Sequence, residues 1–151
     1  MMTSGQEGPY FVGVDVGTGS ARAALVTIDG TILAESTYAT KTFRLESDSR
    51  IFEQSTKDIW SQISSAVQDV LRDSKVDKSL VKGIGFDATC SLAVTDRQGK
   101  ATVVTPDSDF EAGERNVILW ADHRAEEEAK SINSTGSMVL NNVGKTMSVS
   151  G

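Results

Sequence analysis

The segment from Val12 to Asp29 constrains the fold more than any other part of the sequence, because two apolar stretches flank one short turn of small residues. It reads VGVDVGTGSARAALVTID. This pattern predicts a strand, a tight turn and a second strand. Asp15 lies near the end of the first predicted strand, and Arg22 begins the second. The segment therefore predicts a β-hairpin with one charged residue on each side of its turn.

The turn itself has the composition of a phosphate-binding loop. It consists of Gly17, Thr18, Gly19 and Ser20. Glycine lets a phosphate approach the backbone N–H groups closely, and the hydroxyls add further donors. Asp15 beside the turn could hold Mg²⁺ directly or through water, as phosphate-bound magnesium is usually held. These residues predict phosphoryl chemistry, and the alternative is an ordinary hairpin turn of common turn residues.

Two other phosphate-binding motifs fit less well. A dinucleotide fingerprint opens a helix, whereas this turn is followed by the strand-like run from Ala23 to Val26. Gly144, Lys145 and Thr146 match the end of a P-loop, but the first glycine of that motif would fall at Val139. The sequence thus favours the hairpin turn as the phosphate site.

Composition limits the size, the partners and the location. The chain has 151 residues, enough for one compact domain, and a formal net charge of −6. Nucleic-acid binding depends on clustered Lys and Arg, so an acidic chain argues against a nucleic-acid partner. Cys90 is the only cysteine, which rules out an intrachain disulfide and favours a reducing compartment; we expect its thiol to be packed. No apolar stretch approaches the ~20 residues of a membrane span, and no signal peptide is evident, so we expect a cytoplasmic protein without a membrane partner.

The rest of the pattern predicts an α/β fold with a mixed sheet that starts β-β-β-α-β. The Asp29-Gly30 dipeptide is a strong hairpin signal between the second and third strands. A helix is expected from about Ser55 to Arg72, a second helix capped by Asp122, and a short one over 137–143. Strands are expected at 10–16, 22–28, 31–39, 81–86, 91–95, 101–105 and 116–120, loops at 41–51 and 107–113, and a flexible leader at 1–9.

Three of the predicted strands end in or near an acid. These acids are Asp15, Asp87 and Asp122. Ligands in open α/β sheets collect beyond the carboxyl ends of the strands, so three carboxylates there would form a polar cleft able to bind metal. The alternative is that Asp87 is only a turn residue and Asp122 only a helix cap.

Three blocks of sequence, in order, resemble the N-terminal part of the FGGY carbohydrate kinases, which have the actin/hexokinase (ribonuclease H-like) fold. The blocks are GVDVGTGSARAALVTIDG at 13–30, VKGIGFDATCSLAVTD at 81–96 and NVILWADHRAEEEA at 116–129. Within the family, GFDATCS is similar to the pentulose and D-ribulose kinase branch. The resemblance covers 10–151 as part of the first lobe and implies that this lobe is incomplete and that the second lobe is absent.

The resemblance implies transfer of the γ-phosphoryl group of ATP to a hydroxyl of a sugar, most simply D-ribulose or another pentulose. It implies that Asp15 organises Mg²⁺. It also implies two groups of binding residues: Gly17, Thr18, Gly19, Ser20 and Arg22 at the ATP phosphates, and Asp87, Ala88, Thr89, Trp120, Asp122 and Arg124 at the sugar. The family often has a hydroxyl where this chain has Gly19. No catalytic residue is assigned, because the catalytic aspartate of the family lies in a later motif.

The missing motif and lobe lead us to expect little or no kinase activity from these 151 residues alone. We also expect Val117, Ile118 and Leu119 to lack packing partners and to promote association. A non-catalytic interaction or regulatory module is the alternative function. A metal-dependent nuclease is a third, disfavoured by the phosphate loop and the acidic charge. The sequence makes no prediction of the oligomeric state.

Overall fold

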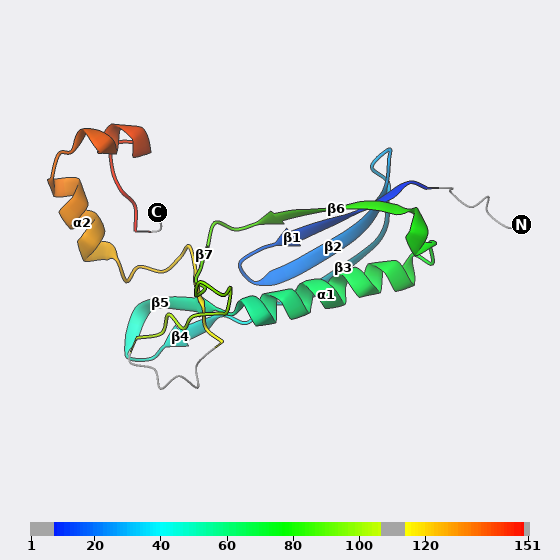
Figure 1. Cartoon of the computed structure of the whole chain (residues 1–151), viewed down its shortest axis with the longest axis horizontal. Helices are drawn as coiled ribbons and strands as arrows, with labels where there is room; N and C mark the ends of the chain where they lie inside the picture. The colour runs from blue at the N-terminus through cyan, green and yellow to red at the C-terminus, as the bar shows by residue number, and fades with distance from the viewer. Residues whose placement is uncertain (1–7, 107–113, 150–151) are drawn as a thin grey trace, which may run out of the picture. The chain divides into compact units, whose positions relative to one another are not determined.

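A computed structural model describes residues 8–106 and 114–149, and the chain divides into two units. Unit 1 comprises Met1–Lys41 and Lys57–Thr89; unit 2 comprises Thr42–Thr56 and Cys90–Gly151 (Figure 1). The predicted loop at 107–113 and most of the predicted leader lie outside the described residues.

Unit 1 is built on a four-stranded mixed sheet with the order β3-β2-β1-β6. Its strands are β1 (Tyr10–Val16), β2 (Ser20–Thr27), β3 (Ile32–Ala39) and β6 (Val81–Ala88). The first three are antiparallel neighbours, and β6 runs parallel to β1. The predicted mixed sheet is therefore confirmed, and the elements of unit 1 follow the predicted order β-β-β-α-β, but in the chain two short strands of unit 2 stand between β3 and the helix.

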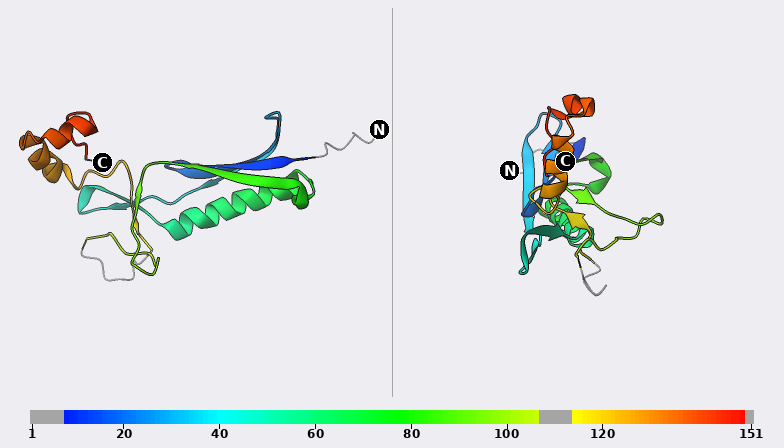
Figure 2. Two further views of the ribbon diagram at one scale, coloured as in Figure 1. Left: turned by 45° about the horizontal axis from the view of Figure 1, so that its top comes forward. Right: turned by 90° about the vertical axis from the view of Figure 1, so that its left-hand side faces the viewer.

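One helix covers one face of this sheet, because both surfaces present small and branched apolar side chains at the right period. Helix α1 (Thr56–Asp73) lies along the sheet of unit 1 (Figure 1 and Figure 2). Alternate residues of β1 and β2 point toward it, as period-2 geometry requires. The buried cluster consists of Tyr10, Val12, Val14, Ala21, Ala23, Leu25, Ile63, Ala66 and Val70.

Polar contacts fix α1 against β3 and shape the turns. The Tyr38 hydroxyl donates a hydrogen bond to the Asp69 carboxylate (2.6 Å), which raises the pKa of Tyr38 and lowers the pKa of Asp69. The hairpin between β2 and β3 is formed, but its turn has three residues, closed by the Thr27 N–H and the Thr31 carbonyl (3.0 Å); Gly30 takes a φ of +86° and Asp29 has no positive φ. A short 3₁₀ helix, η1 (Lys78–Leu80), precedes β6.

Unit 2 contains a second, smaller sheet with the order β4-β5-β8-β7. Its strands are β4 (Phe43–Leu45), β5 (Asp48–Gln54), β7 (Leu92–Ala93) and β8 (Val117–Ile118), all in antiparallel pairs. Helix α2 (Glu126–Ser134) and the 3₁₀ helix η3 (Met138–Val143) follow.

Several local expectations for unit 2 were wrong. The β4–β5 hairpin occupies the segment where a loop was predicted. The strands expected at 91–95 and 116–120 are two residues long each, and the one at 101–105 is reduced to a single bridge between Thr95 and Ala101. Helix α2 begins after Ala125 without a side-chain cap, so Asp122 does not cap it.

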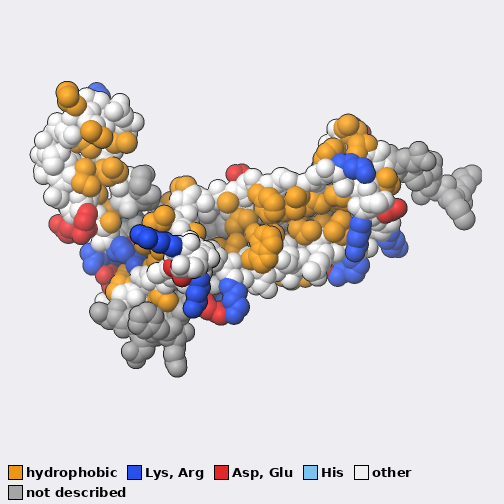
Figure 3. All heavy atoms as spheres, in the orientation of Figure 1, with side chains coloured by type: hydrophobic (Ala, Val, Ile, Leu, Met, Phe, Trp, Pro, Cys, Tyr) orange, Lys and Arg blue, Asp and Glu red, His pale blue; other side chains and the backbone are white. Residues whose placement is uncertain are grey.

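The exposed apolar surface also lies elsewhere than expected. Val117 and Leu119 are buried, at 3% and 2% exposure. On β6, by contrast, Ile84 and Phe86 are 51% and 55% exposed, and Figure 3 shows apolar side chains gathered on one face of unit 1. Within the described residues, no helix is long and apolar enough to span a membrane.

Candidate functional site

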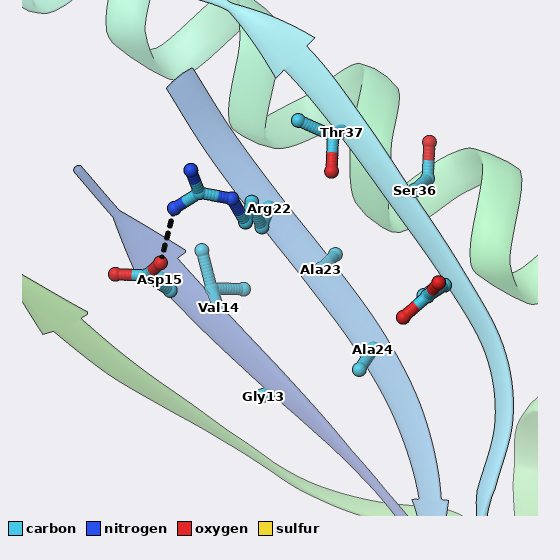
Figure 4. Close-up of a pocket in the computed structure, with 9 residues that line it drawn as sticks. Gly13, Val14, Asp15, Arg22, Ala23, Ala24, Ser36 and Thr37 are labelled. Carbon is cyan, nitrogen blue, oxygen red and sulfur yellow. Dashed lines mark hydrogen bonds and ion pairs between the residues drawn. The ribbon is translucent and has the colours of Figure 1, made fainter. Parts of the chain in front are cut away.

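The predicted phosphate turn lies at one end of the sheet of unit 1, between β1 and β2. The antiparallel register places Asp15 directly opposite Arg22, on the face away from α1. The Arg22 Nη1 and Asp15 Oδ2 atoms are 2.7 Å apart, and each side chain is 54% exposed (Figure 4). The acid and the base that flank the turn therefore form an ion pair that solvent and ligands can reach.

Backbone hydrogen bonds hold the turn from two sides. The Gly17 N–H donates to the Ser20 carbonyl (2.9 Å), which closes the turn. The Gly19 carbonyl accepts from the Thr40 N–H (3.0 Å), and the Thr40 hydroxyl donates to the Thr18 carbonyl (3.4 Å). The segment after β3 thus braces the turn, which limits how much it must reorganise when a ligand binds.

Glycine at 17 serves space rather than backbone conformation. Neither Gly17 nor Gly19 has a positive φ, so the turn does not require glycine on conformational grounds. A Cβ at Gly17 would lie 3.3 Å from Arg22 Nη1, whereas one at Gly19 would meet nothing within 4 Å. A side chain at 17 would therefore require the Arg22 guanidinium to shift by a few tenths of an ångström.

A second carboxylate lies beside this pair. Strand β6 runs parallel to β1 with Asp87 in register with Asp15, so both acids stand at the same end of the sheet. The Ala88 N–H donates to Asp87 Oδ1 (3.0 Å), and the Thr89 N–H donates to the Val16 carbonyl (3.0 Å). The structure thus gathers the predicted residues Asp15, Asp87, Ala88 and Thr89 around the turn.

These acids suit magnesium bound to phosphate better than a metal held by protein alone. The described residues contain no group of three His, Cys, Asp or Glu side chains able to hold a metal ion. Asp15 and Asp87 belong to unit 1 and Asp122 to unit 2, so the three-carboxylate cleft stays a prediction. Protein-bound Mg²⁺ usually takes one or two carboxylates, with water and substrate phosphates as its other ligands. Asp15 and the neighbouring Asp87 fit that requirement.

A hollow of about 330 Å³ runs from the Asp15–Arg22 pair along the same face of the sheet (Figure 4). Small residues form its floor, and β3 forms its far wall. It is lined by Gly13, Val14, Asp15, Arg22, Ala23, Ala24, Glu35, Ser36 and Thr37.

The other predicted site residues belong to unit 2, where they share one cavity of about 500 Å³. The Trp120 residue is 46% exposed, and its backbone N–H donates to the Ser91 hydroxyl (3.3 Å). Cys90 is exposed, so the expectation of a packed thiol was wrong. The cavity is lined by Cys90, Ser91, Leu92, Ile118, Leu119, Trp120, Asp122, Arg124, Ala125 and Val149.

Beneath this cavity lies a buried charged cluster that the sequence did not reveal. Arg124 Nη2 lies 2.8 Å from Glu53 Oε1 and 2.8 Å from Asp122 Oδ2. The two carboxylate side chains are only 1% and 2% exposed. The Thr105 hydroxyl donates to Glu53 Oε2 (2.6 Å), and the Phe52 N–H donates to Asp122 Oδ2 (2.8 Å).

Opposing effects set the ionisation of this cluster. Burial raises the pKa of Asp122, but hydrogen bonds from the Arg124 side chain and from two backbone N–H groups bring the pKa below its ordinary value. Burial lowers the pKa of Arg124, and its bonds to Asp122 and Glu53 raise it above the ordinary value. Asp122 and Arg124 are therefore a charged pair that is already satisfied by protein groups.

Asn116 is a further buried polar residue that the sequence did not mark. Its side-chain oxygen accepts from the N–H and hydroxyl of Thr56 (3.0 and 3.1 Å), and its amide donates to the Val94 carbonyl (3.1 Å). Its place at the start of an apolar run was the only available signal. His123, inside the predicted motif, is exposed.

Comparison with known proteins identifies relatives of the chain. A sequence model of the N-terminal domain of the FGGY family of carbohydrate kinases matches residues 10–148. The D-ribulokinase of Saccharomyces cerevisiae is 43% identical over 144 residues, which are 95% of this chain and 20% of that protein. The FGGY carbohydrate kinase domain-containing protein of Homo sapiens is 43% identical over 150 residues, 98% of this chain and 26% of that protein.

A solved structure shows the fold. The glycerol kinase of Plasmodium falciparum, solved with ADP, superimposes with a TM-score of 0.65 at 15% identity, over 89% of this chain and 24% of that one. The predicted actin/hexokinase-like α/β fold is confirmed. The chain spans about a fifth to a quarter of the length of the curated relatives named above.

Proposed function

The chain belongs to the FGGY family of carbohydrate kinases, and we propose that the protein carrying it transfers the γ-phosphoryl group of ATP to a hydroxyl of a pentulose, with D-ribulose as the preferred substrate. One observation carries this proposal: an open, braced hairpin turn with the exposed Asp15–Arg22 pair beside it. The similarity to a D-ribulokinase supports the choice of sugar.

The turn and its charged neighbours would bind the phosphates. Phosphoryl transfer needs alignment and stabilisation of spread negative charge more than covalent help from the protein. Thr18, Ser20 and the turn backbone offer donors, and Arg22 offers a guanidinium that solvent reaches. Asp15 would hold Mg²⁺, which when bound offsets the charge of the phosphates.

Two groups of residues would bind the sugar. In unit 1 the resemblance assigns to the sugar Asp87 and Ala88, the last two residues of β6, and Thr89 after them; in unit 2 it assigns residues that line the cavity there, Trp120, Asp122 and Arg124. Trp120 would lie against the carbon skeleton of the sugar. Polar groups paired with particular hydroxyls would reject a sugar that leaves them unpaired.

The residues of this chain account for binding and alignment but not for proton transfer. The hydroxyl that attacks needs a carboxylate to accept its proton, and the resemblance places that aspartate in a later motif. We therefore propose that these 151 residues alone do not catalyse phosphorylation of the sugar. A cytoplasmic location is the accompanying proposal, supported by the single cysteine.

A segment exchange tests the proposal. Residues 10–148 would replace the matching segment of the S. cerevisiae D-ribulokinase, and the phosphorylation of D-ribulose by this chimera would be measured with MgATP. Asp15→Asn and Arg22→Met should each lower kcat/KM for MgATP by about 100-fold, because each removes a charged partner of the phosphates or their metal. Arg72→Met is the matched control, since Arg72 has an exposed side chain, pairs with Asp69 on α1 and lies outside the site.

The proposal fails if the chimera is folded but does not phosphorylate D-ribulose. It also fails if the chimera is active and both site variants behave as Arg72→Met does. Circular dichroism would establish that each variant is folded before its kinetics are compared.

A further inference from the structure

Each nitrogen of the Arg124 guanidinium donates to a protein group of unit 2. Its Nε donates to Asp122 Oδ1 (2.9 Å), and its Nη1 donates to the Val104 carbonyl (2.9 Å). Its Nη2 donates to both Glu53 and Asp122, at 2.8 Å each. Every nitrogen of the side chain therefore has a fixed partner, and Arg124 is placed to hold protein structure.

Glu53 is the most deeply buried member of this cluster. Its side chain is 1% exposed, one oxygen accepts from Arg124 and the other from the Thr105 hydroxyl. The Glu53 backbone pairs with Ile118 in the β5–β8 ladder. Glu53 is thus bonded both to the beginning of the segment that carries Trp120 and, through Arg124, to its end.

Strand β5 holds this segment at several further points. The Leu119 N–H donates to the Phe52 carbonyl (3.0 Å), and the His123 N–H donates to the Arg50 carbonyl (2.9 Å). The Phe52 N–H reaches the Asp122 carboxylate in return (2.8 Å). Between these ties Trp120 lines the cavity of about 500 Å³. The orientation of Trp120 therefore depends on contacts made behind it by β5.

The charge of Glu53 helps to hold the Arg124 guanidinium in place. Two buried carboxylates share one guanidinium, with Glu53 on one side and Asp122 on the other. Such a guanidinium is held in one plane by its two-sided pairing. Without Glu53, Arg124 would retain only Asp122 and the Val104 carbonyl. The segment from 119 to 124 would keep its bonds to Arg50 and Phe52 of β5 but would lose the side-chain tie from Arg124 to this strand.

We propose that Glu53 is a positioning residue for sugar binding, which acts through Arg124 to hold the 119–124 turn so that Trp120 faces the cavity. The proposal rests on the proposed function for the identity of the ligand in that cavity. It assigns no contact between Glu53 and the sugar. The resemblance places Asp122 and Arg124 at the sugar site; in this proposal they help to hold the same turn.

Kinetics of the chimera test the effect on the sugar. Glu53→Ala should raise the KM for D-ribulose by about tenfold or more, because Trp120 would no longer be held in the orientation that binds the sugar, and should leave the KM for MgATP within about twofold. Glu53→Gln, which keeps an acceptor for Arg124, should restore most of the affinity. Glu46→Ala removes the same charge from the exposed turn of the β4–β5 hairpin and should change neither constant.

Fluorescence of the 151-residue chain tests the positioning directly. In a Trp60→Phe background Trp120 is the remaining tryptophan, and Glu53→Ala should increase its quenching by acrylamide while the far-UV circular dichroism stays unchanged. If Glu53→Ala does not fold, Glu53→Asp, which shortens the side chain by one methylene, carries the same test.

Two results would overturn the proposal. One is that Glu53→Ala matches Glu46→Ala in KM and quenching. The other is that both KM values and the circular dichroism change together, which would mean a general structural role. If the parent chimera binds no ketose, the proposed function fails, and the Trp120 quenching still decides whether Glu53 holds the turn.

Discussion

The same substitution at two arginines should have very different effects on stability. Arg22 and Arg124 each pair with an aspartate, at 2.7 and 2.8 Å. Arg22 and Asp15 are both 54% exposed, whereas Arg124 and Asp122 are 20% and 2% exposed. Replacing either arginine by methionine keeps an unbranched apolar side chain and removes the charged guanidinium, so the two variants compare an exposed with a buried ion pair.

The magnitudes follow from burial. An exposed pair contributes at most about 1 kcal/mol to the free energy of unfolding, so Arg22→Met should change it by no more than that. Arg124→Met leaves the Glu53 and Asp122 carboxylates buried without a cation, and losing one partner of a buried pair costs about 3–5 kcal/mol. At an m-value of about 2 kcal/mol/M, a loss of 4 kcal/mol lowers the urea midpoint by about 2 M.

Urea denaturation followed by tryptophan fluorescence measures both effects. The two units can unfold separately, so each needs its own probe. Trp120 reports unit 2 in a Trp60→Phe background, and Trp60 reports unit 1 in a Trp120→Phe background. Arg124→Met should lower the midpoint seen by Trp120 and leave the midpoint seen by Trp60 almost unchanged.

The stabilities of the parent chain and of Arg124→Met should change in opposite directions as the pH falls. In the parent chain the folded-state pKa of Asp122 lies below its ordinary value, so Asp122 stabilises the fold at pH 7, and this contribution is lost as the pH falls through that lowered pKa. Without Arg124, burial should raise the pKa of Asp122, so the variant gains relative stability as the pH falls from 7 toward 4. The reasoning would be refuted if Arg124→Met lowered the free energy of unfolding by less than 1 kcal/mol at pH 7. It would also be refuted if the difference in free energy of unfolding between parent and variant did not decrease toward pH 4.

Three further predictions concern other parts of the chain. Leu25→Ala empties a fully buried position of unit 1 and should cost about 2–5 kcal/mol in urea denaturation followed by Trp60; a loss below 1 kcal/mol would contradict the packing. N-ethylmaleimide should modify the exposed Cys90 and weaken ribulose binding by the chimera, with Cys90→Ala resistant; unimpaired binding after full modification would contradict its place in the cavity. The 151-residue chain should self-associate through β6, and Phe86→Lys should reduce its sedimentation coefficient; equal values would exclude this surface.

The sequence predicted unit 1 well, because its structure depends on neighbouring residues. The helix expected from Ser55 to Arg72 is α1 (Thr56–Asp73), and the expected hairpins lie within two residues of β1, β2 and β3. The pairing of Asp15 with Arg22 follows from the length of a single turn. Local alternation and turn chemistry therefore suffice to place the candidate phosphate site.

Unit 2 was predicted poorly, because distant residues determine its structure. Glu53 lies 71 positions from Arg124 in the chain, and Thr56 lies 60 positions from Asn116. A glutamate that is buried by a distant arginine has the same sequence signal as an exposed one. Charged residues within β4 and β5 hide their alternation, which is why a loop was expected there.

The different burial of Arg22 and Arg124 also indicates which arginine can bind a ligand and which one stabilises the protein structure. A ligand can displace a protein partner only where that partner is weakly held, because the pair must break before new bonds form. The exposed Asp15–Arg22 pair meets this condition, so Mg²⁺ can take Asp15 and a phosphate can take Arg22 at little cost. Arg124 does not meet it, because an arriving sugar would have to leave two buried carboxylates unpaired. The geometry thus favours Arg22 as the arginine that changes partners and Arg124 as the one that keeps the cavity in shape.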